Sequence, residues 1–170
     1  MKWFLKCFKQ YADFGGRARR SEYWWFTLIN FINTMILIVG TFVPLIKLGM
    51  NYSSIEDMDD LELIKAIANN PFFYLYIIYY LAVLIPSISV SVRRLHDIGR
   101  SGYWYFLFIG CSMISSLTNV TTGIVRIILT LVVLALSILF LVWMFTDSQP
   151  GTNIWGPNPK EPQPTEQEQQ

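Results

Sequence analysis

Four long stretches without a charged side chain constrain this sequence more than any other feature. They cover residues 23–46, 66–92, 101–125 and 127–146, and each is bounded by Asp, Glu, Lys or Arg. A helix of about 20 residues rises about 30 Å, which is the thickness of the hydrocarbon core of a bilayer. Only 15% of the residues are charged, whereas soluble domains have roughly a quarter. The sequence therefore predicts an all-α membrane protein.

We expect a bundle of four transmembrane helices with an N-terminal interfacial amphipathic helix. The four spans are predicted at about 23–46, 72–92, 103–117 and 124–145, within one transmembrane domain of residues 23–146. Residues 1–22 are interpreted as a cytoplasmic amphipathic and basic segment. Residues 147–170 are interpreted as a cytoplasmic tail that is rich in turn formers and then disordered from about residue 161.

The amino-terminal segment has the pattern of a helix that lies on a membrane surface. Its apolar residues Trp3, Phe4, Cys7, Phe8 and Tyr11 recur at helical spacing, with lysines largely on another side, and a Gly-Gly pair at 15–16 ends the pattern. The segment lacks an apolar core followed by small residues of cleavage-site type. We therefore expect no cleaved signal peptide and an uncleaved first span.

The acidic loop after the first span is expected to contain a further amphipathic helix. Ser54 is a suitable N-cap, and the sequence Asn69-Asn70-Pro71 is a stop signal. A calcium loop is the less favoured interpretation, because the segment lacks a mid-loop glycine and the required acidic spacing. The two cysteines, Cys7 and Cys111, are far apart and predict neither a disulfide nor a metal site.

The distribution of basic residues predicts the orientation. Ten of the thirteen Lys and Arg residues lie in the amino-terminal segment, the loop at 93–100 and the tail. The positive-inside rule places these three segments, and both termini, in the cytoplasm. Aromatic residues that mark one membrane interface then lie on that side: Trp24, Trp25, Tyr103, Trp104 and Trp143.

This topology brings three polar segments to one membrane face: FGGRARRSEYWW, RRLHDIGRSGYW and DSQPGTNIWGPNPK. Arg19 and Asp147 belong to these segments, and the residues that we select as a candidate site are Arg17, Arg20, Glu22, Arg93, Arg94, His96, Asp97 and Arg100.

Three patterns in these segments resemble a known family. They are F-x-G-R-x-R-R-x-E-Y-W-x-F from residue 14, R-R-L-H-D-x-G-x-S-G from residue 93, and D-x-x-x-G-x-N-x-x-G-x-N-P from residue 147. They resemble the YhaH-type small bacterial inner-membrane proteins, domain of unknown function 805, over roughly residues 8–160. Tyr103 and Trp155 depart from the usual aromatic at their positions. The resemblance implies a multi-pass protein of the bacterial inner (plasma) membrane with four or so helices and no established activity.

The simplest interpretation of the cluster is structural. Gly99 suits a left-handed C-cap and Ser101 an N-cap for the third span. Arg93 and Asp97 are one helical turn apart, a spacing that permits an ion pair between their side chains. The arginines are expected to end the spans at the lipid headgroups and to pair with Glu22, Asp97 or Asp147.

Three chemical interpretations compete with the structural one. A metal-dependent hydrolase pair of His96 and Asp97 would need further histidines, which the chain lacks, so no metal or cofactor is predicted. A triad with Ser101 is disfavoured, since adjacent helical residues point about 100° apart. An arginine pocket for an anionic lipid headgroup is the best functional alternative.

We therefore expect a non-enzymatic integral membrane protein whose cluster ties helix ends together and binds anionic lipid headgroups. A small channel or carrier and a membrane enzyme that acts on a phosphate-bearing lipid stay open as alternatives. No span has a charged residue at its middle, which speaks against a proton relay. Membrane lipids are the expected partners, a homo-oligomer is open, and no nucleic-acid partner is predicted.

Overall fold

The computed structural model describes residues 2–50, 60–117 and 123–161. These residues form six helices: α1 Lys2–Lys9, α2 Arg20–Gly49, α3 Asp60–Ala68, α4 Pro71–Asp97, α5 Tyr103–Leu117 and α6 Ile124–Phe145. The all-α prediction is confirmed, and the predicted bounds of the third and fourth spans match α5 and α6. Helices α2 and α4 run several residues beyond the spans predicted for them, into the charged segments at one end.

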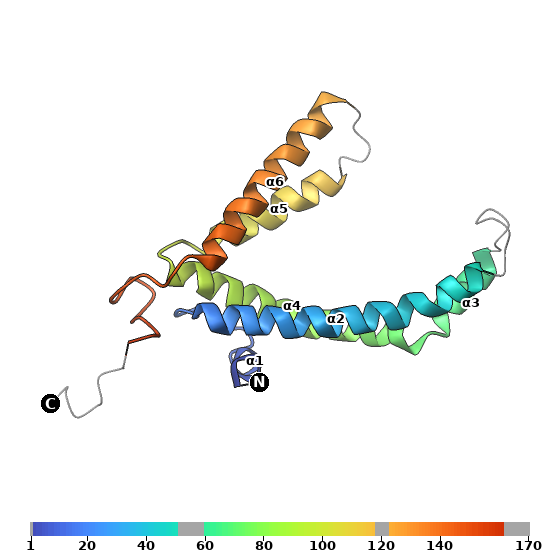
Figure 1. The fold of residues 1–170 in the computed structure, drawn as a ribbon, viewed down its shortest axis with the longest axis horizontal. Coiled ribbons are helices and arrows are strands. Elements are labelled where there is room, and N and C mark those ends of the chain that lie inside the picture. The colour runs from blue at the N-terminus through green and yellow to red at the C-terminus, as the bar shows by residue number, and fades with distance from the viewer. Residues whose placement is uncertain (1, 51–59, 118–122, 162–170) are drawn as a thin grey trace.

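The long helices form two hairpins that diverge from a common end (Figure 1). Helix α2 runs beside α4, and α5 runs beside α6. The two pairs meet only near the α4–α5 turn and do not form one closed bundle. Three helices, α2, α4 and α6, are long and apolar enough to cross a membrane. Helix α5 has 15 residues, which corresponds to about 22 Å, so a fourth crossing stays a prediction.

Helices α2 and α4 approach closely at their far ends. A Cβ atom at Gly40 would lie 2.5 Å from Cδ1 of Phe72, so only glycine permits this contact. Pro44 within α2 has no N–H and cannot bond the Gly40 carbonyl. The Asn70 side chain donates from Nδ2 to the neighbouring Thr41 carbonyl at 2.9 Å, and its Oδ1 accepts from Phe72 N at 3.0 Å. Asn70 thus caps α4 and ties it to α2.

The helix stop predicted at Asn69-Asn70-Pro71 is confirmed, because α3 ends at Ala68. Asn70 is then the N-cap of the next helix, α4, and Pro71 is its first residue. Helix α3 forms the end of the predicted acidic helix and has no buried residue. The predicted cap at Ser54 lies outside the described residues.

The amino-terminal helix is shorter than predicted and packs against the protein. It ends at Lys9 rather than at the glycines, and its apolar face contacts α2 rather than standing free. Phe4 and Phe8 have ring centroids 5.6 and 6.2 Å from that of Phe26, and Cys7 is fully buried. The membrane-surface position of this helix stays a prediction.

Buried residues concentrate at the end where the hairpins meet. Every residue from Ser89 to Asp97 at the end of α4 is buried. A small apolar core lies beside them, formed by Cys7, Ala18, Phe26, Val83 and Val90. Away from this end the helices expose large apolar side chains such as Ile36, Ile78 and Leu131, which is the pattern of a surface in contact with lipid. The fold therefore gathers most of its buried side chains, including the buried charged ones, at one end.

Candidate functional site: a buried charge cluster

The end of α4 is fixed by a glycine cap, as predicted. Gly99 has a φ of 76°. Its N–H donates to the His96 carbonyl at 3.1 Å, and the Arg100 N–H donates to the Leu95 carbonyl at 2.9 Å. This pair of bonds is the Schellman arrangement, which turns the chain sharply after the helix. The turn leaves Asp97 at the last position of α4, facing the surrounding segments.

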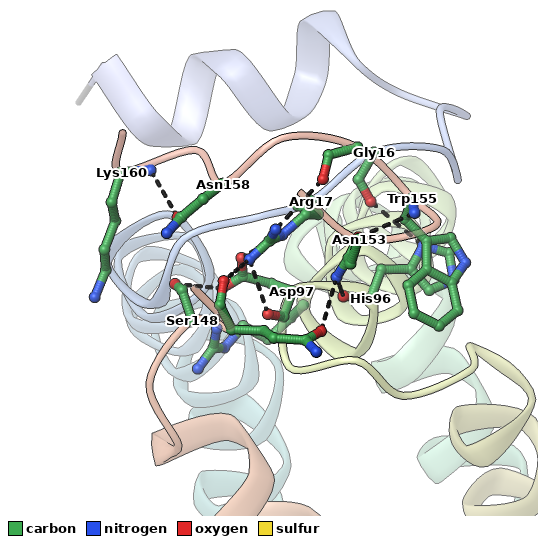
Figure 2. A network of polar contacts seen from close by, with 12 residues as sticks. Gly16, Arg17, His96, Asp97, Ser148, Asn153, Trp155, Asn158 and Lys160 are labelled. Carbon is green, nitrogen blue, oxygen red and sulfur yellow. Dashed lines mark hydrogen bonds and ion pairs between the residues drawn. The ribbon is translucent and has the colours of Figure 1, made fainter. Parts of the chain in front are cut away.

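Asp97 is the centre of the cluster (Figure 2). Its Oδ1 accepts from Arg17 Nε at 3.0 Å, and its Oδ2 accepts from Arg94 Nη1 at 2.5 Å and Ser148 Oγ at 2.6 Å. The Asp97 side chain has no exposed surface. A buried carboxylate needs cations and donors to offset its desolvation. Three segments supply them: the loop before α2, α4 itself and the chain after α6.

Arg17 also binds the backbone of the tail. Its Nη1 donates to the Gly151 carbonyl at 2.7 Å and the Gly156 carbonyl at 3.3 Å, and its Nη2 donates to the Gln149 carbonyl. The Gln149 N–H in turn donates to the Asp97 carbonyl at 2.8 Å. The planar guanidinium presents five donors in fixed directions, so one side chain holds both Asp97 and the turns of residues 149–156.

Arg94 joins the cluster to the end of α6. Besides Asp97, it donates to the carbonyls of Met144, at 3.3 Å, and Thr146. The cation that Asp97 takes from its own helix is therefore Arg94 and not Arg93. The predicted Arg93–Asp97 pair is wrong because Arg93 is engaged by a second buried acid on another side of α4.

That second acid is Glu22, in the first turn of α2. Its Oε2 lies 2.8 Å from Lys6 Nζ, and its Oε1 lies 3.5 Å from Arg93 Nη1. Arg93 Nη1 also donates to the Gln10 side chain. The predicted pairing of arginines with Glu22, Asp97 and Asp147 is confirmed, with Arg20 as the partner of Asp147 at 3.2 Å.

The donors of the cluster are not all used. Arg93 Nε, Arg93 Nη2 and Arg94 Nε are buried and have no hydrogen-bond partner among the described residues. Arg17, Arg93 and Arg94 face two buried carboxylates, Asp97 and Glu22, so the core of the cluster is electropositive. Lys6 adds a further positive charge at its edge, where its side chain is 42% exposed.

His96 lies beside the cluster but does not share its carboxylate. Its Nδ1 lies 3.3 Å from the Gly16 carbonyl, and its ring stacks on Trp155 with centroids 4.6 Å apart and planes 9° apart. The Asp97 oxygens face Arg17, Arg94 and Ser148 instead. Ser101 accepts from the Tyr103 N–H at 3.4 Å, which places it in the turn before α5. The geometry orients no nucleophile through His96 and Asp97, and in the described ranges no group of three or more His, Cys, Asp or Glu is placed to hold a metal.

The two remaining arginines of the predicted set lie at the rim. Arg20 is 42% exposed and donates to the Phe145 carbonyl at 3.1 Å as well as pairing with Asp147. The hydrogen bond from Lys160 is the main cause that lowers the pKa of the Asp147 carboxyl below its usual value, and the hydrogen bond from the Ser148 N–H lowers it further. The guanidinium carbon of Arg100 lies 5.1 Å from the centroid of the Trp143 ring, within the range of a cation–π contact.

Sequence reasoning missed several residues that complete the site. They are polar or aromatic residues whose partners are distant in the chain: Lys6, Gln10, Ser148, Gln149, Asn153 and Trp155. Asn153 Nδ2, for example, donates to the His96 carbonyl at 2.9 Å. The density of turn formers after residue 147 indicated a folded turn, which is confirmed, but no residue pattern shows which carbonyls a turn presents to an arginine.

Comparison with known proteins places the chain in a family. The family model described as a protein of unknown function, DUF805, matches residues 11–157. The chain belongs to the DUF805 family. Among curated relatives from Escherichia coli strain K12, the inner membrane protein YhaI is 42% identical over 108 residues, which cover 64% of this chain and 71% of YhaI. The inner membrane protein YhaH is 38% identical over 109 residues, which cover 64% of this chain and 74% of YhaH. No solved structure matches.

The DUF805 match contains most of the cluster. Arg17, Glu22, Arg94, Asp97 and Trp155 all lie inside residues 11–157, whereas Lys6 and Gln10 precede the matched region. The names of the two relatives, both inner membrane proteins, agree with the apolar helices of this chain, and the family description supplies no activity.

Proposed function

We propose that this protein is a non-enzymatic inner-membrane protein in which the buried charge cluster ties the helix ends together on the cytoplasmic side. Four spans and cytoplasmic termini are part of the proposal. Support for this orientation comes from the basic residues, ten of which lie in the three segments that meet at one end of the molecule (Figure 1).

The observation that carries the proposal is the set of donors on Asp97. Arg17, Arg94 and Ser148 come from three separate parts of the chain and converge on one buried carboxylate. A buried ion pair is weak evidence for stability by itself, but it is strongly directional. We infer that the cluster fixes how the amino-terminal segment, α4 and the tail are arranged, because these three parts of the chain have few apolar contacts that would fix the arrangement instead.

Arg17 is the residue on which this role is best tested. Arg17→Lys keeps the charge but loses the planar fork, so we expect the tail to detach while the helices stay folded. Hydrogen exchange measured by mass spectrometry reports the tail, because the Gln149 N–H is bonded to the Asp97 carbonyl. Exchange in residues 147–161 is expected to accelerate at least tenfold in Arg17→Lys. Arg19→Lys is the matched control, since the Arg19 guanidinium lies 5.9 Å from the Trp3 ring, and the hydrogen bonds to Asp97 and to residues 149–156 described above come from Arg17 instead. Equal exchange in the two variants would contradict the proposal.

A second part of the proposal concerns acidic lipids. The buried arginines already face carboxylates and carbonyls, so lipid contact falls to the rim. Arg20 stands at a groove of about 330 Å³ whose other lining residues are Ser21, Trp24, Trp25, Leu28 and Phe145. An exposed guanidinium beside interfacial tryptophans and an apolar floor suits a phosphate headgroup with its acyl chain.

The lipid part is tested by thermal unfolding in detergent with and without cardiolipin. We expect cardiolipin to raise the midpoint of the parent protein and to have a smaller effect on Arg20→Gln. Arg126→Gln is the matched control, because Arg126 lies in the first turn of α6, away from the cluster. The same cardiolipin response in Arg20→Gln and Arg126→Gln would refute the lipid part and leave the structural part standing.

A further inference from the structure

Polar side chains of three helices converge on one groove within the apolar part of the molecule. On α2, Tyr23, Thr27, Asn30 and Thr34 follow one another at spacings of three or four residues and therefore share a face. The groove that they line has two adjoining parts, of about 340 and 470 Å³. Both parts are also lined by Ser87 of α4 and Tyr105 of α5. The groove thus lies where the two hairpins meet.

Asn30 lines both parts of this groove, and its side-chain amide has an unused hydrogen-bond donor. The Tyr79 hydroxyl donates to Asn30 Oδ1 at 2.6 Å. That hydroxyl also accepts from Asn33 Nδ2 at 3.3 Å, so its own proton points to Asn30. Asn30 Nδ2 is buried and has no partner in the part of the chain that the structure describes. An amide donor without a partner is costly in an apolar environment.

The character of the lining restricts what can bind. All the residues that line the two parts are uncharged, so nothing there would offset a ligand charge. The free Nδ2 group requires an acceptor. The larger part, about 470 Å³, is within the usual range of small-molecule pockets. A neutral molecule with a carbonyl oxygen fits these three conditions.

The depth of Asn30 in the membrane further restricts the class of ligand. Asn30 lies six residues beyond Trp24 on α2, which corresponds to about 9 Å along the helix. With Trp24 at the membrane interface, Asn30 lies inside the hydrocarbon core, below the level of headgroups. A carbonyl at this depth belongs to a molecule that partitions into the bilayer interior.

We propose that the groove between α2, α4 and α5 binds a neutral, carbonyl-bearing hydrophobic molecule, with Asn30 Nδ2 donating to its carbonyl oxygen. This goes beyond the proposed function, which concerns the charged end of the molecule. Two sources share the chemistry: an isoprenoid-type quinone, whose carbonyls lie on a ring, and a neutral acylglycerol, whose carbonyls are esters.

The test is a titration of the thermal midpoint of the full chain in detergent. The probes are decylubiquinone and dioctanoylglycerol, each added alone. We expect one of them to raise the midpoint in a saturable way, and the one that does so identifies the source. Saturation by neither probe would overturn the proposal.

Variants then locate the site. Asn30→Leu is expected to weaken binding of the active probe about 3- to 10-fold, which corresponds to the loss of one hydrogen bond. Thr34→Val is the second variant, because it removes a groove hydroxyl without a change of shape. If Asn30→Leu does not fold, the affinity of Thr34→Val for the active probe tests whether the groove is the binding site. Ser137→Ala is the control, because Ser137 bonds the Val133 carbonyl of its own helix and does not line the groove. Equal affinity in the groove variants and in Ser137→Ala would refute the assignment.

Discussion

Arg17 Nε lies 3.0 Å from Asp97 Oδ1, although eighty positions separate the two residues in the chain. The Arg17 side chain is 1% exposed and that of Asp97 is not exposed at all. The pair fastens the segment before α2 to the end of α4. Because the same guanidinium also binds carbonyls of residues 149–156, the contact is the junction of three parts of the chain.

Asp97→Asn is expected to destabilise the protein strongly. The substitution leaves Arg17 and Arg94 buried without a carboxylate, and the loss of one partner of a buried pair costs about 3–5 kcal/mol. The free energy of unfolding, measured by titration with sodium dodecyl sulfate in mixed micelles, checks this. Asp147→Asn is the control, because Asp147 is 61% exposed and exposed pairs contribute little. Losses of similar size at the two positions would show that burial of the pair has no special role.

Gly99→Ala is expected to lower the stability by at least about 1–2 kcal/mol, the cost of a left-handed conformation for a residue with a Cβ atom. That Cβ would also lie 2.7 Å from Gln149 Oε1, so the end of the Gln149 side chain would have to move. The measurement is again the unfolding free energy. Gly110→Ala serves as the control, since nothing lies within 4 Å of its Cβ position and alanine favours a helix. A Gly99→Ala variant as stable as Gly110→Ala would contradict the cap.

The sequence was sufficient to predict the helices and insufficient to predict their packing. Long uncharged stretches indicated where α5 begins and where α6 ends, because a bilayer admits only helices of a given length and polarity. The second span was predicted to end at about residue 92, although the expected cap at Gly99 implies a helix that continues through Arg93 and Arg94. Charges normally end a span, but here the cluster around them supplies partners that keep the helix regular to Asp97.

Which residues gather at the site was predictable from the sequence, but which of them pair with one another was not. Charge asymmetry placed Arg17, Glu22 and Asp97 on one face. Which arginine pairs with which acid depends on side-chain directions around α4, and the partner expected for Asp97 on its own helix was Arg93 rather than Arg94. The role of Gln149 could not be predicted from the sequence, since its backbone N–H and carbonyl make the bonds to Asp97 and Arg17.

Asn70→Ala is expected to destabilise the α2–α4 hairpin by about 1–2 kcal/mol. It removes both the N-cap of α4 and the bond to the Thr41 carbonyl. Asn69→Ala is the neighbouring control, since its substitution changes neither contact, and unfolding free energies of the two variants are compared. Equal values would mean that the cap does not stabilise the hairpin.

Cys7 is expected to resist alkylation in the folded protein. Burial, followed by the nearby Glu22 carboxylate, raises the pKa of the Cys7 thiol to about 11, so little thiolate exists at pH 7.5. In a Cys111→Ser background, labelling by N-ethylmaleimide followed by mass spectrometry should be slow in detergent and fast after denaturation. Rapid labelling of the folded protein would show that α1 does not stay packed on Phe26.

The contribution of Ser148 and Gln149 to Asp97 also imposes an order on biosynthesis. Both residues leave the ribosome after α6, so Asp97 lacks their donors until α6 has been made. Until then the end of α4 has a buried acid with an incomplete set of donors and an exposed backbone carbonyl. A chain that stops before residue 148 therefore leaves the Asp97 carboxylate without the Ser148 hydroxyl and the Asp97 carbonyl without the Gln149 N–H, so the end of α4 acquires its full set of bonds only in a chain that reaches the tail.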